Sequence, residues 1–185
     1  MRRLCCCLAV VVLCSPSLHA TVLLPAEFRE IVAGSQIIVY GLITDVKPEW
    51  SADRRRIDTV VTLAARSYLK GGPGSTVTFR VPGGQIGRYR NVMVGAPAFR
   101  AGEETVLFLS ASGPSVAHVF GLSQGVFRVR VEARTGRRTV IAPVLTASGD
   151  EPQAVVRGDR TRRQLPLDSF AATVRDAMAK SGGAR

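Results

Sequence analysis

Residues 57–81 read IDTVVTLAARSYLKGGPGSTVTFRV, and apolar and polar side chains alternate in two parts of this stretch. From Ile57 to Leu69 most apolar residues fall on one face, and the pattern returns at Val77, Phe79 and Val81. A period of two is typical of a half-buried β-strand. The glycine- and proline-rich residues 70–74 between the two parts favour a tight turn. The stretch therefore predicts a β-hairpin.

Further strands are expected on both sides of this hairpin. They are residues 36–46, a short strand at 91–94, and residues 105–109, 116–120, 125–133 and 139–141. Residues 48–56 are expected to form a polar turn, and Gly41 marks a bend or a close approach within the first strand. Six or seven strands with short turns predict a mainly β protein, built as a closed or nearly closed antiparallel barrel. A sandwich is the alternative, because periodicity does not separate the two.

Helices are expected only near the two ends of the chain. Residues 25–33 place Phe28, Ile31 and Val32 on one helical stripe. Asp168 can cap a final helix. The stripe of that helix contains Phe170, Ala171, Val174, Ala177 and Met178. The expected organisation is a signal peptide at 1–20, a β-barrel domain with its helix at 21–143, a polar connector at 144–164, and a helix with a tail at 165–185.

The first 20 residues have the three parts of a secretory signal peptide. Arg2 and Arg3 precede the apolar run 4–14, and small and polar residues follow up to Ala20. The run is shorter than the about 20 residues that span a bilayer. We therefore expect cleavage near Ala20, export to the periplasm or the medium, and no membrane-spanning segment in the mature chain.

All four cysteines lie inside the apolar run, at positions 5, 6, 7 and 14. There they are small hydrophobic residues of the export signal. A lipoprotein, with Cys14 as its new N-terminal residue, is disfavoured because Leu13 is bulkier than the residue that such processing accepts. Cleavage would leave no disulfide, no thiolate metal site and no cysteine nucleophile.

The chain is strongly basic, with a net charge of +11. Five arginines fall on the strand pair at 125–141 and form a candidate anion-binding patch. These arginines are Arg128, Arg130, Arg134, Arg137 and Arg138. Arg54 to Arg56, from another turn, are candidates to join this patch. A solvated arginine-rich face explains the same pattern and is favoured. Nucleic acid is the least favoured anionic partner, because export separates the protein from it.

No enzymatic or cofactor-binding motif in the sequence has the structural context that its chemistry requires. Residues 121–125 match the G-x-S-x-G pattern around Ser123, but a strand is expected to follow where the nucleophile elbow needs a helix. His118 precedes the serine, contrary to the order of that fold, and lacks a second histidine or cysteine for a metal site. Glu103 and Glu104 are expected in a solvated turn. The glycine clusters at 71–74 and 83–87 match neither the Walker lysine pattern nor the dinucleotide-binding fingerprint. We expect no catalytic residue, no metal and no cofactor.

Several short motifs follow one another in a characteristic order along residues 25–143. They are Lys70-Gly71, Gly83-Gly84, Gly102-Glu103, Phe108-Leu109, Gln124-Gly125 and Phe127. In this order the core resembles a group of exported bacterial proteins of uncharacterised function. It also resembles the netrin-like version of the oligonucleotide-binding (OB) barrel, as in tissue inhibitors of metalloproteinases. Those inhibitors bind the protease zinc through an N-terminal cysteine, which is absent here, so the resemblance implies a binding barrel and transfers no mechanism.

The leading hypothesis is an exported, non-enzymatic binding module whose partner is a secreted protein or an envelope component. One alternative is a hydrolase that uses Ser123 or scattered carboxylates. The other is electrostatic adhesion to anionic envelope polymers through the arginine-rich strand pair.

Overall fold

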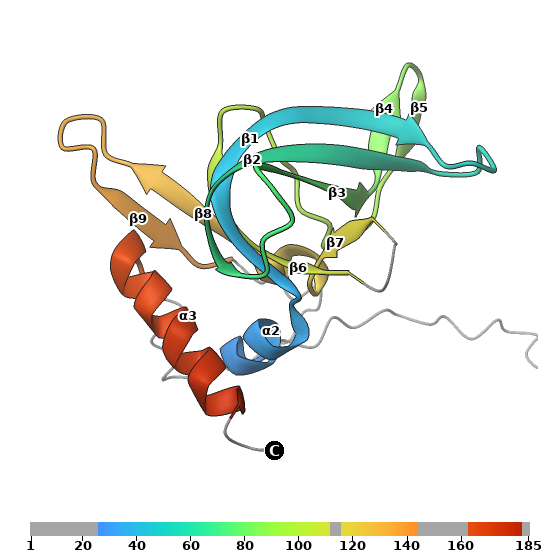
Figure 1. Ribbon diagram of the computed structural model, residues 1–185. Coiled ribbons are helices and arrows are strands. Elements are labelled where there is room, and N and C mark those ends of the chain that lie inside the picture. Colours follow the sequence, from blue (N-terminus) through green and yellow to red (C-terminus); the bar gives the residue numbers. More distant parts are fainter. Residues whose placement is uncertain (1–25, 112–115, 144–162, 183–185) are drawn as a thin grey trace, which may run out of the picture.

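A computed structural model describes residues 26–111, 116–143 and 163–182 (Figure 1). The helices are α2 (Phe28–Gly34) and α3 (Leu167–Gly182), with one 3-10 turn, η1 (Leu122–Gly125). The strands are β1 (Ile37–Trp50), β2 (Ile57–Lys70), β3 (Thr76–Pro82), β4 (Gly84–Ile86), β5 (Tyr89–Asn91), β6 (Glu104–Ser110), β7 (Ala117–Val119), β8 (Val126–Val131), β9 (Arg138–Ile141) and β10 (Leu165–Pro166). The expected signal peptide and residues 144–162 of the expected connector lie outside the described residues.

Five strands close into a barrel in the order β1-β2-β3-β7-β6, and β6 returns to β1. Strand β6 also pairs with β8 along Glu104–Leu107, which extends the sheet outward through β9 and β10. The protein is mainly β, as predicted, but the expectation of a purely antiparallel sheet is wrong. Strands β3 and β7 run parallel, with Phe79 opposite Ala117. Their pairing is short, and it is the contact that completes the ring.

The predicted hairpin at 57–81 is present as β2 and β3, and β1 forms a second, longer hairpin with β2. The register of β1 against β2 shifts between Tyr40 and Gly41, where a Cβ atom on Gly41 would lie 2.3 Å from Ala64 O. The close approach expected at this glycine is therefore confirmed. The polar turn expected at 48–56 is shorter, because β1 continues to Trp50. Pro48 is tolerated there since β6 pairs only with Ile37–Leu42, which leaves β1 with an open edge.

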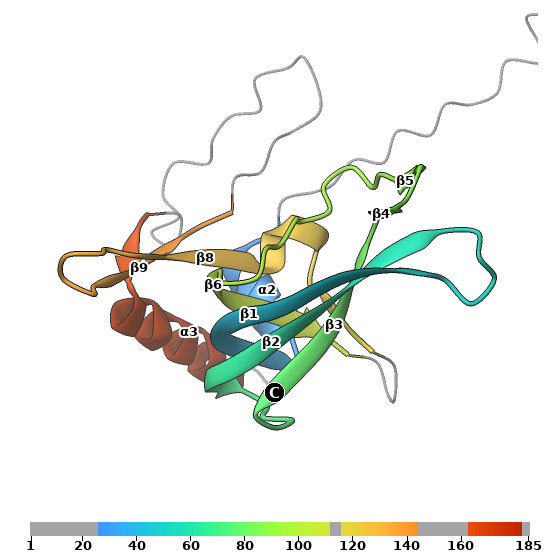
Figure 2. The same cartoon turned by 90° about the horizontal axis from the view of Figure 1, so that it is seen from above.

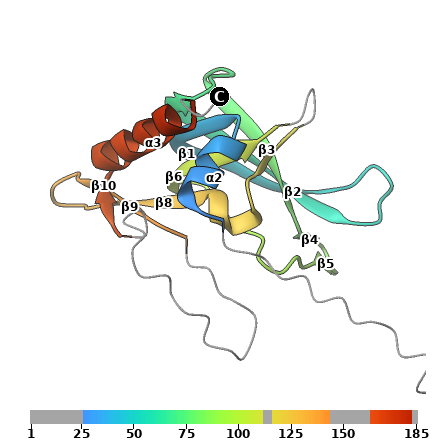
Figure 3. The same ribbon diagram turned by 90° about the horizontal axis from the view of Figure 1, so that it is seen from below.

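Two hydrophobic cores lie on opposite sides of the shared strands. Inside the barrel, Leu63, Phe79 and Leu107 are fully buried. Outside it, α2 and α3 cover the sheet side by side (Figures 2 and 3). The phenylalanine cluster under these helices consists of Phe28, Phe108, Phe127 and Phe170, whose ring centroids all lie 5.0–6.3 Å apart. The C-terminal helix thus packs on its own barrel.

The helices keep their predicted stripes but not their predicted first residues. Helix α2 begins at Phe28, where the carboxylate of Glu30 accepts a 2.9 Å hydrogen bond from the Glu27 amide. Helix α3 begins at Leu167, so Asp168 lies in the first turn rather than before it. Among the residues that the structure describes, neither helix is long and apolar enough to cross a membrane.

The short strand expected at 91–94 is displaced. Residues 84–86 and 89–91 form the separate β4–β5 hairpin, with Gly87 in a left-handed conformation at its turn. Residues 92–94 follow outside any strand. Val92 and Val94 have no strand partner and stand exposed, which matters for the site below.

Candidate functional site

The five candidate arginines share the β8–β9 hairpin but do not form one face. Arg138 lies opposite Val131 in the register, whereas Arg130 lies opposite Thr139. Because successive residues of a strand point to opposite faces, Arg128 and Arg130 project from one face and Arg138 from the other. Arg134 and Arg137 are both exposed near the turn. The predicted patch is therefore split by the sheet.

The turn at 54–56 does not join these arginines. It closes the β1–β2 hairpin, whose tip points away from β8 and β9 to the opposite end of the molecule (Figure 1). The sequence shows which residues alternate within each strand. It does not show where the β1–β2 and β8–β9 hairpins lie relative to each other, because this depends on how the barrel closes.

Arg128 holds a loop rather than facing solvent freely. Its Nη1 donates to Glu103 Oε2 at 2.6 Å and its Nη2 donates to the carbonyl oxygen of Ala98 at 2.6 Å. The guanidinium also lies 6.0 Å from the ring centroid of Phe99. Phe99 is buried against Phe79 inside the barrel, with centroids 5.3 Å apart. Arg128 and Phe99 together fix residues 98–99 at the end of the barrel.

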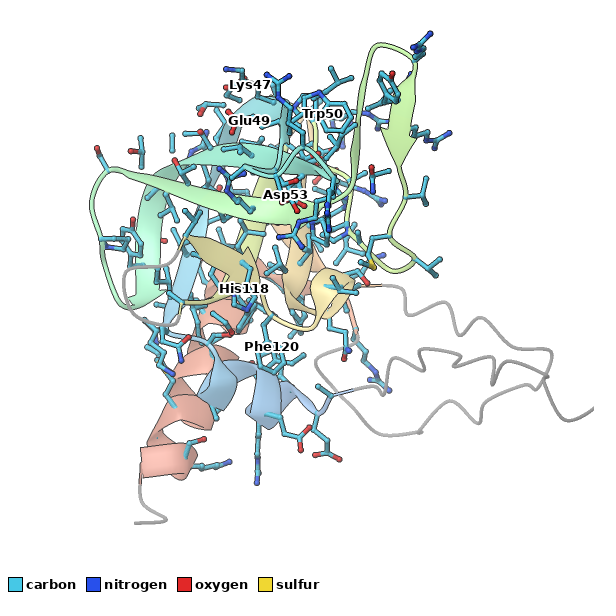
Figure 4. The ribbon with its side chains drawn as sticks, turned by 90° about the vertical axis from the view of Figure 1, so that its right-hand side faces the viewer. Lys47, Glu49, Trp50, Asp53, His118 and Phe120 are labelled. Atoms are coloured by element: carbon cyan, nitrogen blue, oxygen red, sulfur yellow. The ribbon has the colours of Figure 1, made fainter. Side chains whose placement is uncertain are left out.

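Ser123 anchors the same loop from another side. Its backbone amide donates to the carbonyl oxygen of Gly95 at 3.2 Å. The serine lies in η1, which is followed by strand β8, so the helix that a nucleophile elbow requires is absent at this position. His118 is exposed on β7 (Figure 4). No hydrogen bond joins the two side chains in the described part of the chain, and their arrangement does not favour the hydrolase alternative.

An exposed apolar surface lies on the loop that these contacts hold. Four of the six large hydrophobic side chains that are exposed in the described residues fall within 89–94. They are Tyr89, Val92, Met93 and Val94, which we call the apolar rim. Val92 and Val94 are 70% and 75% exposed. Scattered exposed apolar residues are ordinary, but such a concentration makes residues 89–94 a candidate interaction site.

A groove of about 500 Å³ runs beside the apolar rim. Its walls include Val81 and Pro82 from β3, Arg90 from β5, and Met93 and Phe99 from the loop. Volumes of this size are typical of ligand sites. The groove and the rim together form what we call the apolar surface.

The tip of the β1–β2 hairpin borders this surface. The rings of Trp50 and Tyr89 meet edge to face with centroids 5.5 Å apart, and Figure 4 shows Trp50 at this end of the molecule. Arg88 Nη2 donates to the Tyr89 hydroxyl at 3.0 Å. Arg54 and Arg55 lie in the turn after Trp50, and Arg88 and Arg90 flank Tyr89. These four arginines form no ion pair within the described residues, and the turn contains one carboxylate, that of Asp53. The apolar surface therefore carries an excess of positive charge along its border.

A second polar arrangement, missed by the sequence reasoning, centres on Glu104. Arg66 Nη1 donates to Glu104 Oε1 at 2.5 Å, Arg138 Nε donates to Oε2 at 3.0 Å, and the Tyr40 hydroxyl donates to Oε2. Glu104 begins β6 rather than lying in the expected solvated turn, and its side chain is only 10% exposed. These four residues come from β1, β2, β6 and β9, and the pairings of β1 with β2 and β6, of β6 with β8 and of β8 with β9 bring them together. No local pattern therefore indicates the cluster.

The protonation of this cluster follows from its hydrogen bonds. Burial alone would raise the pKa of Glu104, but hydrogen bonds from Tyr40, Arg138 and Arg66 outweigh burial and lower it. Burial and the hydrogen bond to Glu104 raise the pKa of Tyr40. At neutral pH the cluster therefore contains a carboxylate, a neutral phenol and two guanidinium groups.

A cavity of about 520 Å³ opens beside these guanidinium groups. It is lined by Tyr40, Arg66, Gly136, Arg137, Arg138, Pro166, Leu167 and Asp168. Two of the five candidate arginines, Arg137 and Arg138, therefore line the same cavity as Arg66, which belongs to the β1–β2 hairpin. Arg130 and Glu132 line an adjoining cavity of about 440 Å³, which shares Arg137 and Pro166 with this one. No group of three or more metal-ligating side chains occurs among residues 26–111, 116–143 and 163–182.

Comparisons with protein families, with curated proteins and with solved structures found no match. The functional argument therefore depends on the two surfaces themselves. One is apolar with a basic border at the end of the barrel, and the other is a basic cavity beside α3.

Proposed function

We propose that this chain is an exported, non-enzymatic binding module, and that its apolar surface binds an extended polypeptide segment of another exported protein. The signal-peptide pattern of residues 1–20 supports export. The observation that carries the binding proposal is the concentration of exposed apolar side chains in residues 89–94 beside the groove.

The rim is exposed although its loop is held in place. Gly95 accepts from the Ser123 amide, Ala98 accepts from Arg128, and Phe99 is inserted into the barrel. A surface that is ordered before binding loses less conformational entropy on association. These anchors support a recognition role, since they hold Val92–Val94 outward instead of letting them pack on the core.

The chemistry of the partner follows from shape and charge. The groove takes up individual side chains, which a flat bilayer does not supply, and this favours a polypeptide. The bordering arginines favour carboxylates next to the apolar residues of that polypeptide. The expected partner is therefore an extended segment that combines aspartate or glutamate with large apolar side chains.

The barrel topology supports an OB-type module with netrin-like helices. Its first three strands are consecutive neighbours, its last two are interchanged, and it closes through the parallel β3–β7 pair. A five-stranded Greek-key barrel of this kind serves as a binding scaffold in many proteins. That analogy supports the class of function, while the partner is inferred from the apolar surface alone.

The proposal is tested by titrating the purified protein with three synthetic peptides while following the fluorescence of Trp50, the sole tryptophan. One peptide combines apolar and acidic residues, one combines apolar and basic residues, and one is acidic without apolar residues. We expect the first to bind at least about tenfold more tightly than the others, a difference of about 1.4 kcal/mol. Equal binding of the two acidic peptides would instead indicate adhesion to polyanions.

A pair of variants localises the binding. Val92→Ser combined with Val94→Ser is expected to weaken the apolar-acidic peptide about tenfold or more, because it removes two exposed contact residues. Val131→Ser is the matched control, since Val131 is also exposed but lies on β8. Equal loss in both variants, or loss in neither, would contradict the assignment of the site to residues 89–94.

A further inference from the structure

The cavity beside Glu104 contains more guanidinium groups than its carboxylates engage. Arg66 uses Nη1 for both Glu104 and Tyr40, so its Nη2 makes no hydrogen bond within the described residues. Arg138 reaches Glu104 through Nε. The side chain of Arg137 forms neither an ion pair nor a hydrogen bond in that same part of the chain. Arginine presents its donors in a planar fork, and the unused part of each fork suits an oxyanion.

The charge around the cavity selects the kind of anion. Among the described residues, the guanidinium groups of Arg66, Arg137 and Arg138 outnumber the carboxylates of Glu104 and Asp168 by one. The charges of Arg130 and Glu132 in the adjoining cavity cancel each other. One negative charge on the ligand neutralises this excess. A phosphate dianion would exceed it, so the balance favours a carboxylate.

The rest of the cavity suits an organic acid rather than an inorganic ion. Pro166 and Leu167 give it an apolar wall at the start of α3, and its volume of about 520 Å³ is far larger than a carboxylate group alone requires. The Glu104 cluster fixes Arg66 and Arg138 from behind, because the nearly buried carboxylate orients both guanidinium groups. A fixed donor fork binds an anion with a smaller loss of side-chain entropy.

We propose that this cavity binds a small organic carboxylate, with Arg137 and the free Nη2 of Arg66 as donors to the carboxylate and with Leu167 and Pro166 against its hydrocarbon part. This site is separate from the apolar surface, since the two share no lining residue. Strands β4 and β5 lie at the opposite end of the molecule from β9 and α3 (Figure 1). The site does not depend on the function proposed above.

The test is an NMR titration of the full chain with hexanoate, and separately with inorganic phosphate, at constant ionic strength. The arginine Nε–Hε signals are followed, because they report on Arg66, Arg137 and Arg138 directly. We expect saturable shifts with hexanoate and binding of phosphate that is at least about tenfold weaker. Tighter binding of phosphate, or no saturable shift with hexanoate, would overturn the proposal.

Two single-charge variants distinguish a site from general attraction. Arg137→Gln is expected to weaken hexanoate about tenfold or more and to leave folding intact, since the Arg137 side chain forms no ion pair or hydrogen bond within the described residues. Arg175→Gln removes the same charge from the exposed face of α3, outside both cavities, and is expected to change the affinity less than twofold. Equal losses in both variants would show nonspecific charge attraction and refute the site.

Discussion

At the scale of single residues, the neighbours Glu103 and Glu104 have different partners at the start of β6. Glu103 pairs with Arg128 and helps to hold the loop of the apolar surface, whereas Glu104 faces Tyr40, Arg66 and Arg138. Glu104 is the less exposed of the two, with 10% of its side chain accessible against 26% for Glu103. A nearly buried carboxylate with three donors leaves those donors without an acceptor when it is removed.

This difference predicts that Glu104→Gln is more costly than Glu103→Gln. We expect Glu104→Gln to lower the free energy of unfolding by about 2 kcal/mol at pH 7, because two guanidinium groups lose their counter-charge. Glu103→Gln is the matched control and is expected to cost less than about 1 kcal/mol, since its ion pair is more exposed. Urea unfolding measures both values, and a larger loss in the control would contradict the ranking.

The pH dependence of the same variant follows from the lowered pKa of Glu104. Folding lowers this pKa from its ordinary value of 4.5, so the unfolded state binds more protons just below pH 4.5. The stabilisation is present above that pH and is lost as the pH falls through the folded-state pKa. The gap in unfolding free energy between wild type and Glu104→Gln is therefore expected to shrink from pH 6 to pH 3. A gap that stays constant would show that Glu104 stabilises the fold through something other than its charge.

Residue-level patterns explain why some expectations were confirmed and others were wrong. Phe79 and Leu63 could be assigned to the core because burial follows the alternation within one strand. The Glu104 cluster could not be found, because its members are brought together by pairings between β1, β2, β6, β8 and β9 that no local sequence pattern indicates. The five arginines show the same limit: their hairpin was predicted, but the division of its faces depends on register.

At the scale of elements, α3 covers the outer face of the sheet at the junction of the barrel and β8. Phe170 is almost fully buried against Phe28 of α2, Phe108 of β6 and Phe127 of β8. Short strand β10 pairs with β9 just before the helix begins. The apolar stripe of α3 was predictable from its period, but not the surface that the stripe covers. Helix α3 is therefore part of the second core.

Shortening Phe170 is expected to destabilise the whole protein. Phe170→Ala leaves a cavity among the three remaining rings and should lower the free energy of unfolding by about 3–5 kcal/mol. Arg175→Ala on the exposed face of the same helix is the control, with an expected change within about 0.5 kcal/mol. Both are measured by urea unfolding followed by circular dichroism. A loss of less than 1 kcal/mol for Phe170→Ala would show that α3 is only loosely attached.

At the scale of the whole molecule, stability depends on two cores that share strands β1, β6 and β8. Leu107 of β6 points into the barrel while its neighbour Phe108 points to the helices, so the same strand supports both cores. All four cysteines lie at positions 5–14, within the expected export signal. If that signal is removed, packing and hydrogen bonds hold the fold without any disulfide.

If the chain is exported and cleaved, the protein recovered from producing cells should differ from the full chain in location, mass and thiol content. We expect it outside the cytoplasm, with a mass that corresponds to a chain beginning near residue 21, and without reaction with a thiol reagent. Its thermal unfolding midpoint should be the same with and without a reductant, because the cysteines of positions 5–14 are gone. The control is a variant in which Leu8 and Val11 are replaced by Arg, which interrupts the apolar run and should keep the uncleaved chain inside the cell with its thiols reactive. Recovery of an uncleaved, thiol-bearing wild-type chain from the cytoplasm would refute export, and the partner of the apolar surface would then have to be sought among cytoplasmic proteins.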